Sequence, residues 1–293
     1  MTRKSWIQFG FLGFLWGIPY LLMKIAVEDI PPPLIVAGRT LIGAAILIPI
    51  AIHKKSFMDA VRGIKYVLPY ALLEMVGPWI LITSAQKEIS SGLAGLLIAT
   101  VPIFATIFTS MRGDHSVWQP KRIVGLVVGF IGIIALIGIE SITGTSNPKA
   151  IAMVILSAIL YAYAVLMVTS NLPGVDGVAI NGLAMGITFL IYFPIAIATW
   201  PSNPVSAKAV GALVVLGIFS TAIAFMLFFA VIVEIGPARG SLTTYVNTAV
   251  AVVLGILILK EPITLGIIVG LPLVVLGSYL ASRKAKLVVI AEA

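Results

Sequence analysis

Long apolar stretches alternate with short polar turns along the whole chain of 293 residues. Each stretch is about 20 residues long, which is the length that an α-helix needs to cross a hydrocarbon core of about 30 Å. The stretches and the Gly, Pro and charged residues between them predict helices at about 6–26, 33–52, 64–86, 89–110, 121–139, 149–169, 177–200, 208–233, 237–258 and 263–282. This pattern is typical of an all-α polytopic membrane protein with ten transmembrane helices.

The composition excludes a soluble protein. Hydrophobic residues make up 60% of the chain and charged residues only 10%, whereas an ordinary soluble domain has about 25% charged residues. A soluble fold must cover its own surface with polar groups, and this chain has too few of them. The chain contains no cysteine, so it forms neither disulfides nor thiolate metal sites.

The net charge of +8 reflects membrane topology rather than an affinity for nucleic acid. If the N-terminus is cytoplasmic, thirteen basic residues lie on the cytoplasmic side: Arg3, Lys4, Lys54, Lys55, Arg62, Lys65, Arg112, Lys121, Arg122, Arg239, Arg283, Lys284 and Lys286. Five lie outside: Lys24, Lys87, Lys149, Lys208 and Lys260. The positive-inside rule therefore predicts a multi-pass protein of the plasma membrane with both termini in the cytoplasm.

The second half of the chain repeats the first at an offset of 145 residues. This offset aligns "IPIAI" (48–52) with "FPIAI" (193–197), and it matches five of fifteen positions between 121–135 and 266–280. The repeat divides the protein into two five-helix domains, 1–145 and 146–293. Because five is odd, the second domain enters the membrane from the opposite side, as in transporters with inverted repeats around a central site. A duplication retained only for packing is the alternative.

Several segments resemble the EamA-type transporters of the drug/metabolite transporter superfamily. They are "LWGIPYLLMKIA", "PPPLIVAGRTLIGAAI" and "LILKEPITLGIIVGLPLVVLGSYL", and the resemblance extends over both repeats. It implies a ten-helix basket with a central cavity that moves small polar or amphipathic solutes, often outward. The family pattern favours proline early in helices 4 and 9. Here helix 4 has Pro102, but the corresponding residue of helix 9 is Asn247.

Two ionisable residues inside predicted helices are candidates for substrate binding, since charges at membrane depth usually have a function. Arg39 lies roughly 9 Å below the outer face and Glu74 roughly 15 Å above the inner face, at 1.5 Å per residue. An ion pair between them is plausible, direct or bridged by water. The alternatives are that Arg39 reaches the outer headgroups or bonds to Glu28 or Asp29, and that Glu74 is a protonated acid bonded to a neighbouring helix.

Four aromatic residues are further candidates for the substrate site. Trp16 lies in the middle of helix 1, and the repeat offset places Tyr161 at the same position of helix 6. Tyr20 lies one turn from Trp16 on the same face. Trp79 lies further out and could equally belong to an interfacial belt. Rings with a polar edge suit amphipathic solutes, although each ring could also serve ordinary helix packing.

Helix 9 is polar in its first half and adds Thr244, Tyr245 and Asn247 to the predicted substrate-binding residues. Threonine hydroxyls can bond back to their own helix. The amide of Asn247 is more informative, because an amide at the middle of the membrane needs a partner from another helix, water or substrate.

Intramembrane catalysis and ATP-driven pumping lack their motifs in this chain. There is no H-E-x-x-H, no G-x-S-x-G and no G-x-x-x-x-G-K-[ST]. We therefore predict a secondary transporter that exports small metabolites, without catalytic residues, cofactor or metal. A channel or a small structural membrane subunit is the alternative. The expected partners of the transporter are a small-molecule substrate and the lipid bilayer. Proton coupling and facilitated diffusion are both open, and we expect a monomer or a weak homodimer.

Overall fold

The computed structural model describes residues 3–113, 120–142, 147–235 and 243–282, and every regular element in these ranges is a helix. The first half contains α1 (Arg3–Ala26), α2 (Pro32–His53), α3 (Phe57–Arg62), α4 (Ile64–Ala71), the π-helix η1 (Leu72–Val76), α5 (Gly77–Ala85), α6 (Ser91–Ile98), α7 (Val101–Met111) and α8 (Pro120–Ile142). The second half contains α9 (Pro148–Asn171), α10 (Gly177–Ala198), α11 (Ala207–Gly217), the π-helix η3 (Ile218–Ile223), α12 (Ala224–Ile235), α14 (Thr243–Leu259) and α15 (Leu265–Ser282).

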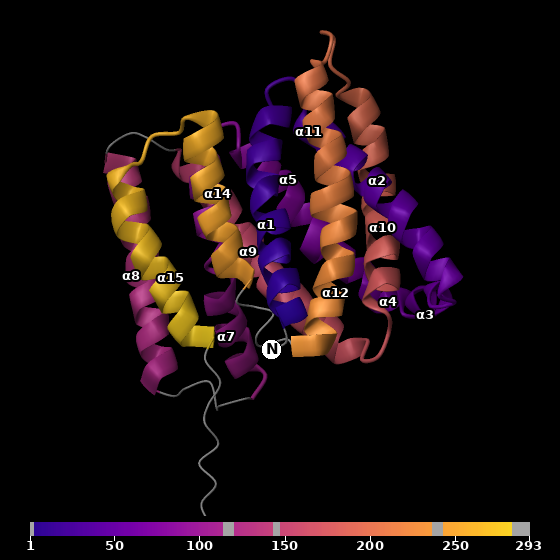
Figure 1. Cartoon of the computed structure of the whole chain (residues 1–293), viewed down its shortest axis with the longest axis horizontal. Helices are drawn as coiled ribbons and strands as arrows, with labels where there is room; N and C mark the ends of the chain where they lie inside the picture. The colour runs from indigo at the N-terminus through magenta and orange to yellow at the C-terminus, as the bar shows by residue number, and fades with distance from the viewer. Residues whose placement is uncertain (1–2, 114–119, 143–146, 236–242, 283–293) are drawn as a thin grey trace, which may run out of the picture.

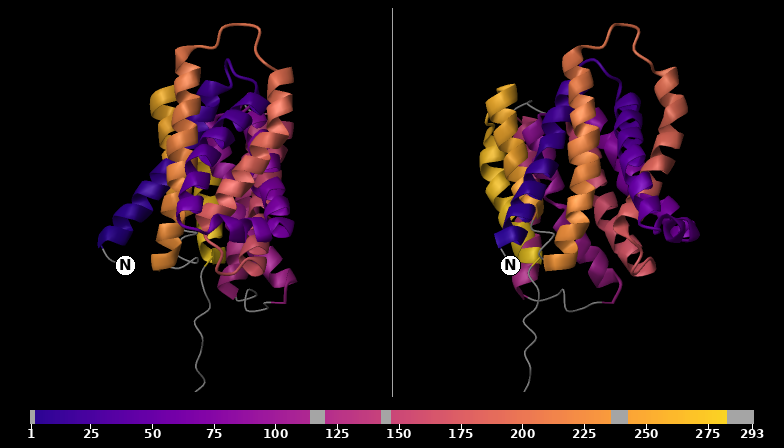
Figure 2. Two further views of the ribbon diagram at one scale, coloured as in Figure 1. Left: turned by 90° about the vertical axis from the view of Figure 1, so that its right-hand side faces the viewer. Right: turned by 45° about the vertical axis from the view of Figure 1, so that its right-hand side comes forward.

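The long helices run side by side as a bundle. Helices α8 and α15 form one flank, and α2, α10 and α4 form the other, with α1, α9 and α14 between them (Figure 1). Helix α1 begins and α15 ends at the same end of the bundle, while the connections α10–α11 and α14–α15 lie at the opposite end (Figures 1 and 2). The start of α1 and the end of α15, both predicted to be cytoplasmic, thus lie opposite two connections predicted to be external.

Seven helical segments in the described ranges are long and apolar enough to cross a membrane. They are Ile7–Ala26, Pro32–His53, Ile64–Ala85, Ser91–Met111, Pro148–Asn171, Gly177–Ala198 and Ala207–Phe228. Three shorter apolar helices, Ile123–Ala135, Val246–Leu259 and Leu265–Gly277, coincide with the fifth, ninth and tenth predicted helices. The protein is therefore an all-helical membrane protein.

Three of the predicted continuous helices are interrupted. The predicted helix 64–86 contains η1 and the predicted helix 208–233 contains η3. The predicted helix 89–110 is broken between α6 and α7, just before Pro102. The prolines explain two of the interruptions: Pro102 and Pro78 have no N–H, so the carbonyls of Ile98 and Glu74 lose their usual partners four residues later. In η3 the side chain of Thr221 bonds instead to the carbonyl of Leu216.

Small residues bring corresponding helices of the two halves into close contact. A Cβ at Gly277 of α15 would overlap the backbone nitrogen of Gly129 in α8. A Cβ at Gly182 of α10 would lie 3.3 Å from the backbone nitrogen of Ile48 in α2. Such contacts are typical of helix pairs in membranes, where small side chains let backbones approach. The two flanks of the bundle therefore each join one half of the chain to the other.

Candidate functional site

Arg39 lies on the buried face of α2, two turns after the helix begins at Pro32. Only 5% of its surface is exposed. Its Nε and Nη2 atoms both donate to Oγ1 of Thr221, at 3.2 and 3.1 Å, and its Nη1 contacts Sδ of Met23 at 3.8 Å. The proposal that Arg39 reaches the headgroups is therefore wrong, because the guanidinium points into the protein. Glu28 pairs with Lys208 and Asp29 accepts from the Ser206 amide instead.

The ring of Trp79 packs against the guanidinium of Arg39. The guanidinium carbon lies 3.6 Å from the centre of the Trp79 ring, a close cation–π contact. Trp79 belongs to α5, which starts directly after η1, and only 4% of its surface is exposed. Its predicted alternative place in an interfacial belt is therefore wrong, since a belt residue would have its ring at the surface of the bundle.

Thr221 connects this site to the second half of the chain. It lies in η3, and its hydroxyl donates to the carbonyl of Leu216 at 2.9 Å while accepting from Arg39. Thr221 could not be predicted as a site residue from the sequence, because a single threonine in an apolar helix usually bonds to its own backbone. Only the packing of α2 against η3 distinguishes it from the other threonines.

Arg39 and Glu74 do not form the direct ion pair that the sequence allowed; the ion pairs of the described residues join other side chains. Glu74 lies in η1 and its Oε2 is buried without a hydrogen-bond partner among the described residues. The alternative for Glu74, a carboxyl group bonded to a neighbouring helix, is likewise not seen at Oε2. The π-helix rotates this side chain relative to a regular α-helix, and π-helical turns of this kind often occur at functional sites.

Tyr161 is within electrostatic range of both Arg39 and Glu74. Its hydroxyl interacts with both the Glu74 carboxyl and the Arg39 guanidinium, and Tyr20 also interacts with Arg39. Tyr161 packs against both large hydrophobic clusters of the bundle. The structure therefore gathers Arg39, Trp79, Tyr20 and Tyr161 into one polar and aromatic cluster, hereafter the Arg39 cluster.

Trp16 has different ring partners from those of Tyr161. Its ring lies 4.7 Å from that of Phe228 and 5.9 Å from that of Phe225, both in α12. The residues around it, such as Leu12 and Leu15, form a separate small hydrophobic cluster. Trp16 therefore packs against α12, and the ring contacts of the described residues do not pair it with Tyr161.

Of the three predicted binding residues in α14, the structure describes the side chain of Asn247. Asn247 is buried, and its Oδ1 accepts from the Thr248 hydroxyl at 3.3 Å. That hydroxyl also donates to the carbonyl of Gly95 in α6. The Thr248 hydroxyl therefore joins α14 to α6, one helix from each half, and the Asn247 amide lies next to this contact. The side chains of Thr244 and Tyr245 lie outside the described residues.

A second polar cluster, here called the Glu261 clasp, joins the α14–α15 connection to the start of α6. The Glu261 carboxylate accepts from the Ser91 amide at 2.6 Å, from the Ser91 hydroxyl at 3.0 Å and from the Gly92 amide at 3.1 Å. Nearby, Lys24 donates to the carbonyls of Gln86 and Ile89. Two residues of the family-like segments, Lys24 and Glu261, therefore hold one end of the bundle together.

Tyrosine hydroxyls hold α4 and η1 against α10. Tyr70 donates to Oδ1 of Asn181 at 3.0 Å, and Tyr192 donates to the carbonyl of Val76 in η1 at 2.8 Å. These bonds satisfy polar groups that have no water available in a membrane. These pairs could not be predicted from the sequence, because Tyr70 and Asn181 are more than a hundred residues apart.

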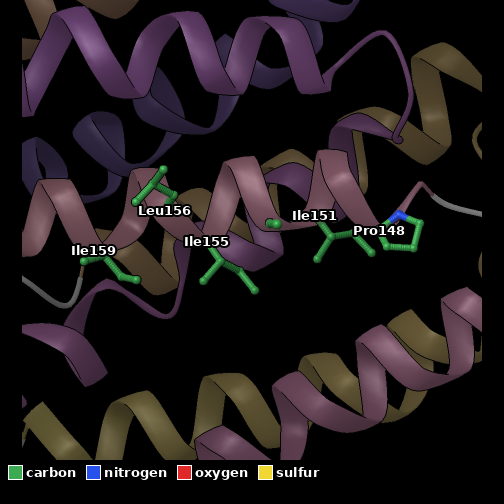
Figure 3. Close-up of a pocket in the computed structure, with 6 residues that line it drawn as sticks. Pro148, Ile151, Ile155, Leu156 and Ile159 are labelled. Atoms are coloured by element: carbon green, nitrogen blue, oxygen red, sulfur yellow. The ribbon is translucent and has the colours of Figure 1, made fainter.

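An apolar groove on α9 contains none of the predicted binding residues. It has a volume of about 330 Å³ and is lined by Pro148, Ile151, Ala152, Ile155, Leu156 and Ile159. Figure 3 shows Ile151 and Ile155 on the same side of α9. The lining offers no polar side chain to a solute, so the groove suits lipid chains better than a polar substrate. Within the described ranges no group of three His, Cys, Asp or Glu side chains could hold a metal ion.

Several known proteins with similar sequences are named as transporters. The sequence pattern of the EamA-like transporter family matches the chain twice, over residues 4–138 and 148–283. The uncharacterized transporter YoaV of Bacillus subtilis (strain 168) is 28% identical over 271 residues, which cover 91% of this chain and 92% of that protein. The uncharacterized inner membrane transporter YedA of Escherichia coli (strain K12) is 29% identical over 283 residues, covering 93% and 91%.

A solved structure described only as "Crystal structure of protein" has the same fold. Its TM-score is 0.65, and the alignment covers 96% of this chain and 97% of that chain at 19% sequence identity.

Proposed function

Because the chain belongs to the EamA-like transporter family, we propose that it is a secondary transporter that exports small metabolites by alternating access. Amino acids or amphipathic compounds are the substrate classes, and the Arg39 cluster is their binding site. Alternating access requires a central site between two parts of the protein that can open to either side in turn. The arrangement of the two halves supports this mechanism.

The observation that carries the proposal is the contact between Arg39 and Thr221. It links α2 of the first half to η3 of the second through a buried charge. Trp79 comes from the first half and Tyr161 from the second, so both halves supply side chains to the same cluster. A ligand bound there would contact both halves, and its binding energy could shift the equilibrium between their arrangements.

Structural correspondence between the halves supports two inverted repeats, 1–145 and 146–293. The π-helix η1 spans residues 72–76 and η3 spans 218–223, so the two overlap at the offset of 145 residues. Helix α2 packs against its counterpart α10, and α8 packs against its counterpart α15. An odd number of five helices in each repeat would invert the second one, giving ten crossings with both termini in the cytoplasm.

The glycine contacts within the chain fit a monomer or a weak homodimer. Gly129 and Gly277 contact each other within one chain, which leaves them unavailable for pairing with a second copy. The family and its relatives are transporters, and we infer that this protein is likewise not an enzyme. Its place is the plasma membrane, in line with the relative described as an inner membrane transporter.

Counterflow in liposomes tests this function. Purified protein is reconstituted with an unlabelled solute inside, and uptake of the labelled solute is followed for amino acids, other metabolites and cationic drugs. A transporter gives saturable uptake with transient accumulation above equilibrium, whereas a channel gives neither saturation nor counterflow. The absence of counterflow with every solute class would contradict the proposal. Vesicles containing Arg112→Gln protein serve as a control, since Arg112 is an exposed arginine outside the Arg39 cluster.

A further inference from the structure

Among the described residues, no counter-ion accompanies the buried charge of Arg39. Ion pairs among the described residues join Lys54 to Asp176, Arg62 to Asp59 and Lys208 to Glu28, and Arg39 takes part in none of them. Its neighbours are a hydroxyl, a thioether and an aromatic face. Burial of a charge without an opposite charge is costly, and a neutral side chain would fill the same space at a lower cost in free energy.

The hydrogen bonds of Arg39 leave part of its donor fork open. A guanidinium has five N–H groups, and its contacts with Thr221 and Met23 use three of them. Nε and Nη2 both donate to the single hydroxyl oxygen of Thr221. A carboxylate would offer these two N–H groups one oxygen each. The remaining N–H of Nη2 points toward Nη1, at the other edge of the fork.

The surroundings restrict a ligand to the edges of the guanidinium. Trp79 covers one face of the guanidinium, whose Cζ lies 3.6 Å from the ring centre. A hydrogen-bonding group approaches Arg39 in the plane of the guanidinium, because its N–H groups point outward in that plane. Tyr20 and Tyr161 lie within electrostatic range of the guanidinium, and their hydroxyls can donate further hydrogen bonds to an anion. A cationic ligand would be repelled by Arg39 at the same place.

From this geometry we propose that Arg39 binds an oxyanion, a carboxylate or phosphate group, of the transported solute, and that Thr221 occupies that place when no solute is bound. The inference rests on the solute site of the proposed function and deepens it, because it assigns an anionic group to the substrate. Carboxylate and phosphate share the two-oxygen edge that pairs with the fork of arginine. A basic drug with no anionic group lacks that edge.

Ligand-induced stabilisation of the purified protein tests the proposal without transport. Thermal unfolding in detergent is measured with amino acids and other carboxylates, with the amides of the same compounds, with phosphate esters, and with cationic amphiphiles. We expect stabilisation by an oxyanion compound, and a loss of affinity of about tenfold or more when its carboxylate is converted to an amide, in line with charge-assisted bidentate pairing. Stabilisation by phosphate esters and not by carboxylates would show that the oxyanion is a phosphate.

Variants separate recognition from a structural role. Arg39→Lys keeps the charge but loses the fork, and we expect it to weaken oxyanion binding about tenfold or more. Thr221→Val removes the competing hydroxyl, and we expect it to bind the same compound at least as tightly as the native protein. The matched control is Arg112→Gln, because Arg112 also lies over an aromatic ring, Tyr163 at 5.8 Å, but is exposed. It should bind like the native protein.

Three outcomes of the binding measurements would overturn the proposal. One is the absence of stabilisation of the native protein by any oxyanion compound. Another is equal binding of the carboxylate and its amide, and the third is unchanged oxyanion binding by Arg39→Lys. Oxyanion binding without counterflow would instead support this inference and contradict the proposed function. Counterflow of cationic solutes alone would support the transporter and overturn the oxyanion site.

Discussion

The carboxylate of Glu261 caps the first turn of α6 through the amide and hydroxyl of Ser91, 170 positions earlier in the chain. A carboxylate at a helix N-terminus is favourable because the free N–H groups and the helix dipole both attract negative charge. The cap joins the α14–α15 connection of the second half to the start of α6 in the first half. It therefore fixes the distance between the halves at that end of the bundle.

Removal of this cap should destabilise the protein. We expect Glu261→Ala to lower stability by about 1–3 kcal/mol, because it leaves two amides of α6 without partners. Thermal unfolding in detergent measures the loss. The control is Glu28→Ala, whose carboxylate forms an exposed pair with Lys208 at 3.7 Å and should cost less than about 1 kcal/mol. Equal losses for the two variants would contradict a special role for the Glu261 clasp.

The contact between α8 and α15 should not tolerate a side chain at Gly277. A Cβ there would overlap the backbone of Gly129, so Gly277→Ala must push the helices apart, at a cost of about 1–3 kcal/mol. Gly211→Ala in α11 is the control, since a Cβ there meets no atom within 4 Å and alanine favours helix. We expect the first substitution to lower the unfolding temperature and the second to leave it unchanged or raise it.

Glu74 should be the residue that couples transport to protons. Its Oε2 is buried without a hydrogen-bond partner among the described residues, so none of them donates a hydrogen bond that would compete with a proton for this oxygen. We expect Glu74→Gln to abolish solute accumulation driven by a pH gradient and to retain counterflow at equal pH. Uptake into proteoliposomes with and without a pH gradient distinguishes gradient-driven accumulation from counterflow. Accumulation that depends on the gradient equally in both proteins would exclude Glu74 as the coupling site and leave facilitated diffusion or another group.

The aromatic residues should differ in what they contribute. Tyr161→Phe removes only the hydroxyl that interacts with Arg39 and Glu74, and we expect transport to fall about fivefold, the equivalent of one hydrogen bond of about 1 kcal/mol. Trp16→Phe keeps a ring against Phe225 and Phe228 and should transport almost normally, whereas Trp16→Ala should be impaired. Transport rates per folded molecule, with folding assessed by gel filtration, check these expectations. Normal transport by folded Tyr161→Phe protein would place Tyr161 outside the site.

Reporter fusions should reveal the inverted topology. We expect fusions at positions 58 and 116 to report the cytoplasm, and fusions at 30, 145 and 204 to report the outside. In the structure the α10–α11 connection, which includes position 204, lies at the end opposite the start of α1. Fusions at 58 and 204 on the same side would contradict two inverted repeats.

The sequence alone determined the class of the protein and the position of its helices. Lengths of apolar runs report the thickness of the solvent that a helix crosses, so a local property of the chain was sufficient to predict membrane helices and most of their limits. The family resemblance was also carried by local segments and is confirmed by the family match over both halves. The cost of a charge at membrane depth singled out Arg39 as a candidate, but the sequence left open whether its side chain reaches the headgroups, and the structure shows that it is buried.

Only the tertiary structure decided which residues meet. Arg39 and Glu74 have compatible depths in the membrane, but depth does not determine the direction in which a helix face points, and the guanidinium lies on Trp79 and Thr221 instead. The two π-helices change that direction further, because each inserts a wide turn in the middle of a long helix. Pairings such as Arg39 with Thr221 join positions 182 residues apart, so they depend on helix packing and not on the periodicity of either segment.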